Sequence, residues 1–136
     1  MTTTALNTTA PTDPLPFVGL KVIDCASYIA GPAAAMILGD LGADVVKLEP
    51  PNGDPHRDLY KLLGLGEPAS NFVWDLNSRG KRSLVLDLKL AAGQAVLHRL
   101  VAQADVFITN LPLPVRARLA IDADTLTALN PRLRNS

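Results

Sequence analysis

Short apolar runs alternate with helical segments along this chain, and this alternation restricts the possible folds more than any other feature. Four runs rich in Val, Ile and Leu have the composition of buried parallel strands: residues 20–24, 44–48, 83–88 and 105–109. Three further segments have helical character: residues 33–41, 91–102 and 125–129. Strands that alternate with helices pair in parallel, so the sequence predicts an α/β fold, with helices on both faces of a mostly parallel sheet.

Proline, glycine and aspartate mark the expected ends of these elements. Pro32 fits the first turn of a helix, where a missing N–H costs nothing, and Gly42 provides a stop after that helix. Asp122 or Asp124 is expected to cap the last helix. Residues 51–68 contain several Gly and Pro residues and are expected to form a long loop.

Length and hydropathy set the domain organisation. Residues 1–16 are rich in Thr and Pro and are expected to form a flexible tail. Residues 17–136 then form one domain, because a chain of 136 residues can build one core but not two. The longest apolar stretch, at 28–39, is interrupted by Gly31 and Pro32 and is too short to cross a membrane.

Charge and cysteine content limit which partners this chain is expected to bind and which kinds of site it can form. The chain has 13 Lys and Arg residues against 13 Asp and Glu residues, a balance that argues against binding nucleic acid. Cys25 is the single cysteine, which excludes an internal disulfide and favours a cytoplasmic location. It closes a predicted strand and is expected to be a buried apolar group rather than a nucleophile. His56 and His98 are too few and too badly spaced to form a metal site with Cys25.

Polar side chains follow the predicted strands, at the edge where open α/β sheets bind ligands. Lys89 ends the third predicted strand, and Asn110 ends the fourth, with Arg116 and Arg118 shortly after it. Asn110 could contact a ligand or satisfy the backbone of its own turn, and the two guanidinium groups could clamp an anion. The basic segment 77–83 could meet phosphates or form a solvated loop. No GxGxxG, GxSxG or GxxxxGK[ST] motif is present, so the residues alone indicate an anion-binding edge and no reaction.

Taken together, the motifs resemble the class III CoA-transferases, which include formyl-CoA and carnitine CoA-transferases and the related α-methylacyl-CoA racemases. The resemblance starts with GLKVID at 19–24, AGP at 30–32 and LGADVVKLEPP at 41–51. It continues, in the same order along the chain, with Gly53, Asp54, Arg57, Asn77, KRS at 81–83, LDLK at 86–89, ADV at 104–106, Asn110, RL at 118–119 and LNPR at 129–132. These motifs cover residues 17–133.

The resemblance implies a Rossmann-like domain that binds coenzyme A or acyl-CoA as a substrate and holds no tightly bound cofactor. Ten residues match the CoA contacts of the family: Ile29, Ala30, Leu86, Asp87, Leu88, Lys89, Asn110, Leu111, Pro112 and Arg118. Backbone groups near Ala30 and at 86–88 would hold the adenine and the pantetheine, while Lys89 and Arg118 would meet phosphates. Ile29 stands where formyl-CoA transferases carry a glutamine, and it cannot donate a hydrogen bond to a formyl substrate.

The resemblance further implies that the intact enzyme moves CoA from an acyl-CoA to a carboxylic acid through an aspartate nucleophile. That aspartate lies beyond the point matching Ser136, so the chain is expected to be an N-terminal portion, with an incomplete domain and no catalytic residue of its own. A fragment of an acyl-CoA racemase and a non-catalytic nucleotide-binding or dimerising module are alternatives. Family members form interlocked dimers, so a homodimer is expected for the full-length protein, with neither nucleic acid nor membrane as a partner.

Overall fold

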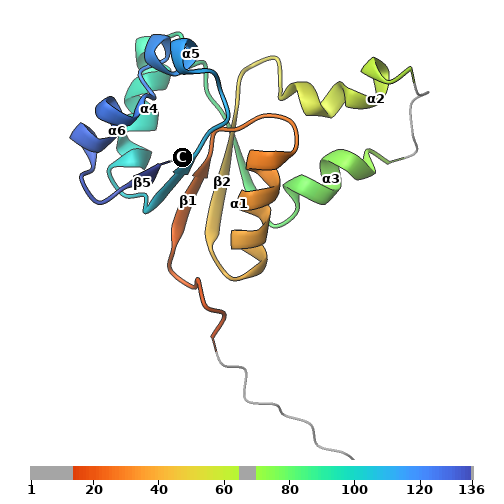
Figure 1. The fold of residues 1–136 in the computed structure, drawn as a ribbon, viewed down its shortest axis with the longest axis horizontal. Coiled ribbons are helices and arrows are strands. Elements are labelled where there is room, and N and C mark those ends of the chain that lie inside the picture. The colour runs from red at the N-terminus through yellow and green to blue at the C-terminus, as the bar shows by residue number, and fades with distance from the viewer. Residues whose placement is uncertain (1–13, 65–69, 136) are drawn as a thin grey trace, which may run out of the picture.

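A computed structural model describes residues 14–64 and 70–135 (Figure 1). In this part of the chain the strands are β1 (Lys21–Asp24), β2 (Asp44–Glu49), β3 (Arg82–Val85), β4 (Val106–Ile108) and β5 (Arg134–Asn135). The helices are α1 (Ala30–Asp40), the 3-10 helix η1 (Pro55–Asp58), α2 (Leu59–Leu62), α3 (Phe72–Ser78), α4 (Ala91–Val101), α5 (Leu113–Arg118) and α6 (Ala123–Leu129). Most of the predicted tail, residues 1–13, lies outside the described residues.

The strands form one parallel sheet in the order β3-β2-β1-β4-β5. β1 lies at the centre, where Ile23 is paired with Val46 of β2 on one side and with Phe107 of β4 on the other. The chain first moves outward through β2 and β3, and then returns to add β4 and β5 on the opposite side of β1. Open α/β sheets bind ligands at the carboxyl edge beside such a reversal. The predicted Rossmann-like α/β fold is therefore confirmed.

Helices cover both faces of the sheet, and each face has its own apolar core (Figure 1). α1 packs on one face, where Ala35 meets Val22, Val45 and Ile108. α4 and α6 cover the other face, whose core consists of Ile23, Cys25, Leu48, Leu97, Val101, Ala104, Phe107, Ile121, Leu126 and Leu133. Neighbouring residues of β1, Val22 and Ile23, thus belong to opposite cores, because successive side chains of a strand point to opposite faces. In the described residues no helix is both long and apolar enough to cross a membrane.

Most of the predicted elements form, although their ends differ. α1 begins at Ala30, three residues earlier than predicted, so Ala30 belongs to the helix and not to the loop before it. Gly42 follows this helix with a φ of +103°, as expected for a glycine stop. Asp122 is the residue that caps α6. β3 ends at Val85, so residues 86–88, which the sequence predicted to continue the strand, lie in the loop before α4.

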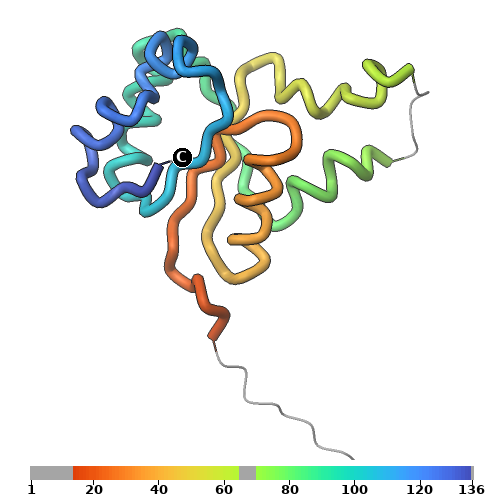
Figure 2. Tube along the Cα trace, in the orientation of Figure 1, coloured from red at the N-terminus to blue at the C-terminus, as the bar shows by residue number. Residues whose placement is uncertain are grey.

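The segment predicted as a long loop contains helices. η1 and α2 follow β2, and α3, which the sequence did not predict, packs against α1. We call η1, α2 and α3 the arm, and Figure 2 shows its trace extending beyond α1 on the side away from α4 and α6. Asn71 caps α3, since its Oδ1 accepts a hydrogen bond from Trp74 N at 3.4 Å.

Two elements near the end of the chain were also not predicted. The turn that follows Asn110 leads directly into α5, which starts at Leu113 with a proline in its first turn. β5 consists of Arg134 and Asn135, which pair with Val106 and Phe107 of β4 and extend the sheet by one strand.

Candidate functional site

A cavity of about 300 Å³ lies at the carboxyl ends of the strands, between the loop after β1, the loop after β3 and α5. Most of its wall is apolar: Leu48, Leu86, Leu88, Leu111, Val115 and Leu119 all line it. The β1–α1 loop, residues 25–29, contributes Cys25, Ala26 and Ser27. An apolar cavity of this size with a few polar groups around it is typical of a small-molecule site.

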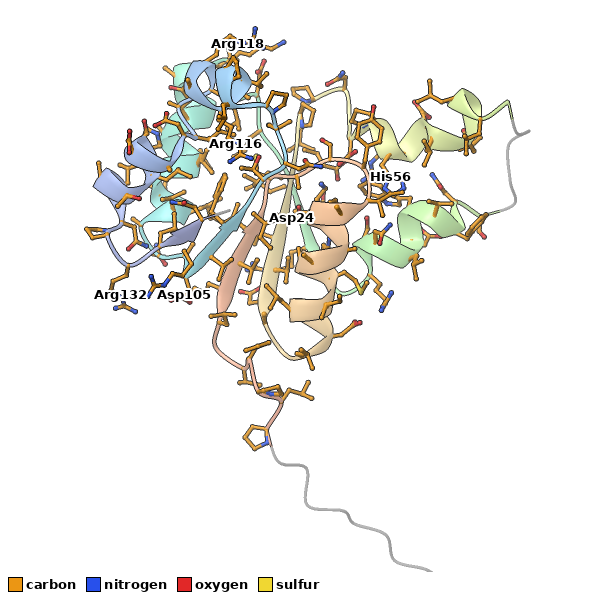
Figure 3. All side chains as sticks on the ribbon, viewed as in Figure 1. Asp24, His56, Asp105, Arg116, Arg118 and Arg132 are labelled. Atoms are coloured by element: carbon orange, nitrogen blue, oxygen red, sulfur yellow. The ribbon has the colours of Figure 1, made fainter. Side chains whose placement is uncertain are left out.

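Lys89 and Arg118 lie at the mouth of this cavity. Both line it, and both also border an adjoining open hollow of about 360 Å³. In Figure 3 the Arg118 side chain is on the outer side of α5, directed away from the sheet. Among the described residues, neither side chain has an ion-pair partner. Two cations at the mouth of an apolar cavity favour a ligand that has an anionic end near solvent.

The loop between β3 and α4 forms one wall of the cavity and is held close to α4. Gln94 of α4 donates from Nε2 to Leu88 O at 3.0 Å, and Asp87 accepts a hydrogen bond from Lys89 N at 3.0 Å. A Cβ atom on Gly93 would lie 2.1 Å from Asp87 O. Only glycine therefore permits α4 to approach this wall so closely.

The β1–α1 loop forms another wall and is held from both neighbouring strands. Asn110, which follows β4, accepts a hydrogen bond from Ser27 N at 2.9 Å and donates from Nδ2 to Ser27 O at 2.7 Å. From the other side, Lys47 of β2 donates from Nζ to Ala26 O. Both peptide groups at the wall are thus fixed by side chains that lie far away in the sequence.

Four charged side chains beside this loop form a network that we call the buried quartet: Asp24, Lys47, Asp54 and Lys81. Lys47 Nζ lies 2.8 Å from Asp54 Oδ2 and 3.7 Å from Asp24 Oδ1, and Lys81 Nζ lies 2.7 Å from Asp24 Oδ2. The Lys47 and Asp24 side chains are 2% and 0% exposed. Burial lowers the pKa of Lys81, and its ion pair with Asp24 opposes that shift. Two positive and two negative charges balance, so the fold buries no net charge here. Figure 3 shows Asp24 between the strands and α1.

Glu49 lines the cavity, but its carboxylate is committed to an ion pair. Arg57 of η1 donates two hydrogen bonds to it, at 2.7 and 2.8 Å, and Ser83 Oγ donates a third at 3.2 Å. The hydrogen bond from Arg57 is the main reason that the pKa of Glu49 is lowered. The Arg57 guanidinium also lies 3.9 Å from the centre of the Trp74 ring, so it connects the arm to the end of β2.

Burial shifts the pKa of two further groups. Cys25 is buried, as predicted, and burial raises the pKa of its thiol to about 12. His56, which belongs to η1 of the arm, is 1% exposed, and burial lowers its pKa. Its Nε2 has no hydrogen-bond partner among the described residues, and its ring stands edge-on to Trp74 at 6.2 Å. Among the described residues, no group of three or more His, Cys, Asp and Glu side chains is placed to hold a metal ion.

The ten residues predicted to contact CoA all lie at the carboxyl edge of the sheet. Six of them line the cavity: Leu86, Asp87, Leu88, Lys89, Leu111 and Arg118. The remaining four are beside it: Ile29 and Ala30 at the start of α1, Asn110 after β4, and Pro112 before α5. The side chain of Asn110 satisfies backbone groups, as one interpretation held, but those groups belong to the β1–α1 loop and not to its own turn. Contact with CoA stays a prediction for all ten.

Several other cations have structural partners. Arg116 donates to Leu111 O at 2.6 Å and to Thr109 O at 3.2 Å, so it holds the chain that leaves β4; in Figure 3 it points inward, whereas Arg118 points outward. In the basic segment 77–83, Lys81 belongs to the buried quartet, and two arginines form ion pairs at 2.6 Å, Arg79 with Asp40 and Arg82 with Asp44. The three cations of the segment thus have partners within the fold, and contact of this segment with phosphates stays a prediction.

Some residues of the cavity wall were not predicted. Glu49 and Pro50 end and follow β2, so the rule that selected Asn110 at a strand end could have selected them. Val115 had no comparable signal, because the sequence did not predict α5.

Residues 17–133 match the family model described as CoA-transferase family III. The chain belongs to this family. It is 39% identical over 120 residues to the cinnamoyl-CoA:phenyllactate CoA-transferase of Clostridium sporogenes, and 41% identical over 122 residues to the succinate–glutarate CoA-transferase of Agrobacterium fabrum. These alignments cover 86% and 87% of this chain, but 29% and 30% of the two relatives. The chain thus spans less than a third of the length of these curated relatives.

A solved structure supports the assignment to the family. The CAIB/BAIF family protein from Brucella suis superimposes with a TM-score of 0.80 and is 36% identical in sequence. The similarity covers 90% of this chain and 33% of that protein. The fold described above is therefore shared with a member of the CaiB/BaiF group.

Proposed function

We propose that this chain forms the CoA-binding part of an enzyme that transfers CoA between carboxylic acids. The substrates of that enzyme would be an acyl-CoA and a free carboxylic acid, and the transfer would pass through a carboxylate nucleophile. The observation that carries the proposal is the apolar cavity at the carboxyl edge of the sheet, with Lys89 and Arg118 at its mouth, neither of which has an ion-pair partner in the described part of the chain. Membership in CoA-transferase family III supports the same activity.

The chemistry of coenzyme A matches the two parts of this site. Its adenine and its pantetheine can lie against the leucine-lined wall, while its phosphates can remain near solvent beside the two cations. Leu86, Asp87 and Leu88 line the cavity, and the backbone groups of this loop would suit the amides of pantetheine. Ile29, Ala30 and Pro112 would contact the ligand at the rim.

The proposal assigns no catalytic residue to this chain. Two carboxylates, Glu49 and Asp87, line the cavity. The Arg57 guanidinium occupies both oxygens of Glu49 and lowers its pKa, which makes that carboxylate a weak nucleophile. Asp87 already accepts a hydrogen bond within its own loop. We therefore expect the purified chain to show no exchange of CoA between acids, and turnover by this chain would contradict the assignment.

The proposal includes a homodimer for the whole protein. Large apolar side chains are exposed on α1, on the arm and directly after α2: Ile37, Leu62, Leu63, Phe72 and Leu76. Such a group of exposed apolar residues is typical of a surface that packs against another protein surface. Analytical ultracentrifugation of this chain and of a longer chain containing it would test this part of the proposal.

Isothermal titration calorimetry with CoA and with ATP tests the binding function directly. ATP shares the adenine and phosphates but lacks the pantetheine, so we expect the chain to bind CoA more tightly. Arg118→Ala and Lys89→Ala should each weaken CoA binding by about tenfold, because each removes one charge-assisted contact. The matched control is Arg99→Ala, which removes an exposed arginine of α4 that does not line the cavity.

The outcomes are distinct. Binding of CoA that is weakened by the substitutions at Lys89 and Arg118, and unaffected by Arg99→Ala, supports the proposal. Equal affinity for CoA and ATP would favour a general nucleotide-binding module. No binding of CoA would overturn the proposed function of the chain.

A further inference from the structure

We propose that Asn110 is a positioning residue that fixes the β1–α1 loop in the shape needed to receive the CoA ligand. It would act through Ser27, which lines the cavity, and not through a hydrogen bond from its own side chain to the ligand. This inference rests on the proposed function of the cavity as a CoA site.

Both polar atoms of the Asn110 side chain are engaged by the loop. Its oxygen accepts a hydrogen bond from Ser27 N at 2.9 Å, and its nitrogen donates to Ser27 O at 2.7 Å. The two bonds join residues that are 83 positions apart in the sequence. Such a pair of bonds fixes the backbone on both sides of the Ser27 Cα, because Ser27 N and Ser27 O belong to two successive peptide groups.

On its other side the loop is held by two members of the buried quartet. Lys47 donates to Ala26 O, and Asp54 Oδ1 accepts a hydrogen bond from Tyr28 N at 3.5 Å. Lys47 belongs to β2 and Asn110 follows β4, and these strands are the two neighbours of β1 in the sheet. Each neighbouring strand therefore supplies one side chain that holds the loop after β1.

The loop has a backbone conformation that needs such support. Tyr28 has a φ of +63°, in the left-handed region that residues other than glycine rarely adopt. The residue directly before it is Ser27, which Asn110 holds through both of its backbone polar groups. Without Asn110, the loop can relax towards ordinary backbone angles, and Ser27 then leaves its place in the cavity wall.

The expected consequence is a loss of preorganisation. A loop that is already fixed does not have to be ordered when the ligand binds, whereas a mobile loop must be ordered at the expense of affinity. We expect Asn110→Ala to bind CoA about tenfold more weakly than the unmodified chain, since two hydrogen bonds that order the wall are removed. Amide hydrogen exchange at Ser27 should become faster by at least about tenfold.

The chain offers a matched control. Asn130 also donates from Nδ2 to two backbone carbonyls, Val101 O at 2.9 Å and Ala104 O at 2.8 Å, but it lies in the turn after α6 and does not line the cavity. Asn130→Ala should therefore lower the thermal stability without changing the affinity for CoA. Asn110 is exposed, so Asn110→Ala should leave the fold intact. If that variant does not fold, Asn110→Asp is the second variant, because it keeps the oxygen that accepts the hydrogen bond from Ser27 N.

Calorimetry at two salt concentrations separates positioning from direct contact with a phosphate. For Asn110→Ala the loss of affinity should be the same at low and high salt, because no ligand charge is involved. For Arg118→Ala the loss should shrink as salt screens the charges. Salt-independent weakening together with faster exchange at Ser27 supports the inference. Unchanged affinity of the Asn110 variant for CoA overturns the inference, and so does a loss of the same size in Asn130→Ala. If the unmodified chain does not bind CoA, the proposed function is overturned instead.

Discussion

Replacing Gly93 by alanine should destabilise this protein, although alanine is the better helix former. Gly93 lies in the first turn of α4, next to the loop that forms a wall of the cavity. An added Cβ would lie 2.1 Å from Asp87 O, which is 0.9 Å inside the 3.0 Å approach that real Cβ atoms respect. The atom in the way belongs to the backbone, so no side-chain rotation can relieve the overlap, and α4 and the loop must move apart.

The size of the effect follows from two opposing contributions. Overpacking costs about 1–3 kcal/mol, and a clash with backbone belongs at the upper end of that range. Alanine in place of glycine within a helix stabilises it by about 1 kcal/mol. The net loss is therefore about 2 kcal/mol in the free energy of unfolding, which corresponds to a fall in Tm of about 8 °C for a domain of this size.

Urea denaturation followed by far-UV circular dichroism measures this loss. Gly39→Ala in α1 is the matched control, because its Cβ would lie 3.4 Å from Val45 Cγ2, an ordinary contact distance. That substitution should stabilise the chain by about 0.5–1 kcal/mol through helix propensity alone. If Gly93→Ala proved as stable as the unmodified chain while Gly39→Ala behaved as expected, the close approach of α4 to Asp87 would be refuted.

Three other predictions concern buried groups. Lys81→Met should lower the free energy of unfolding, measured by urea denaturation, by about 3 kcal/mol, because it removes a buried partner of Asp24. Arg82→Gln breaks an exposed ion pair and should lower it by less than about 1 kcal/mol. Losses of similar size in the two variants would contradict the burial of Lys81. Burial lowers the pKa of His56 in the fold, so the unfolded chain binds the proton first as the pH falls, and the free energy of unfolding should decrease from about pH 7 towards pH 5. A chain with His56→Gln should lose this part of the pH dependence. An unchanged slope in that variant would contradict the role of His56. With its pKa raised to about 12, the Cys25 thiol should react with iodoacetamide far more slowly in the fold than in denaturant, as mass spectrometry can measure, and equal rates would contradict the burial.

The parts of the fold that the sequence predicted are those with a local cause. β1 and β2 are apolar runs bounded by turn residues, and α1 ends at Gly42, whose positive φ suits glycine. The predicted strand at 83–88 was too long, because its apolar pattern continues into Leu86 and Leu88, which face the cavity and not a partner strand.

The elements that the sequence did not predict form because of contacts with other parts of the chain, and the residues of one segment alone do not show these contacts. α3 contains Phe, Val, Trp and Asn, which are poor helix formers, and it is stabilised by its Asn71 cap and by Trp74 stacking on Arg57. β5 consists of the polar residues Arg134 and Asn135 and becomes a strand only because β4 has a free edge beside it.

The same distinction applies to the candidate site. Asn110 could be selected because strand ends are visible in the sequence and meet at one edge of a parallel sheet, whereas Lys89, selected by the same rule, lies in the loop after β3 and still lines the cavity. The burial of Lys81 could not be predicted, because its partner Asp24 lies 57 positions away and nothing near Lys81 distinguishes it from the neighbouring exposed arginines.

The buried quartet also has a consequence for how this sequence can change over generations. Removing one of its charges leaves an opposite charge buried without a partner, which is strongly destabilising, while replacing a whole buried set by apolar residues of similar volume is often tolerated. Asp24, Lys47, Asp54 and Lys81 therefore resist single substitutions and can be exchanged only together. Because Lys47 and Asp54 also hold the β1–α1 loop, such a joint exchange would release the cavity wall even where it preserved the fold. Lineages of this chain that keep the cavity in use should therefore keep all four charges.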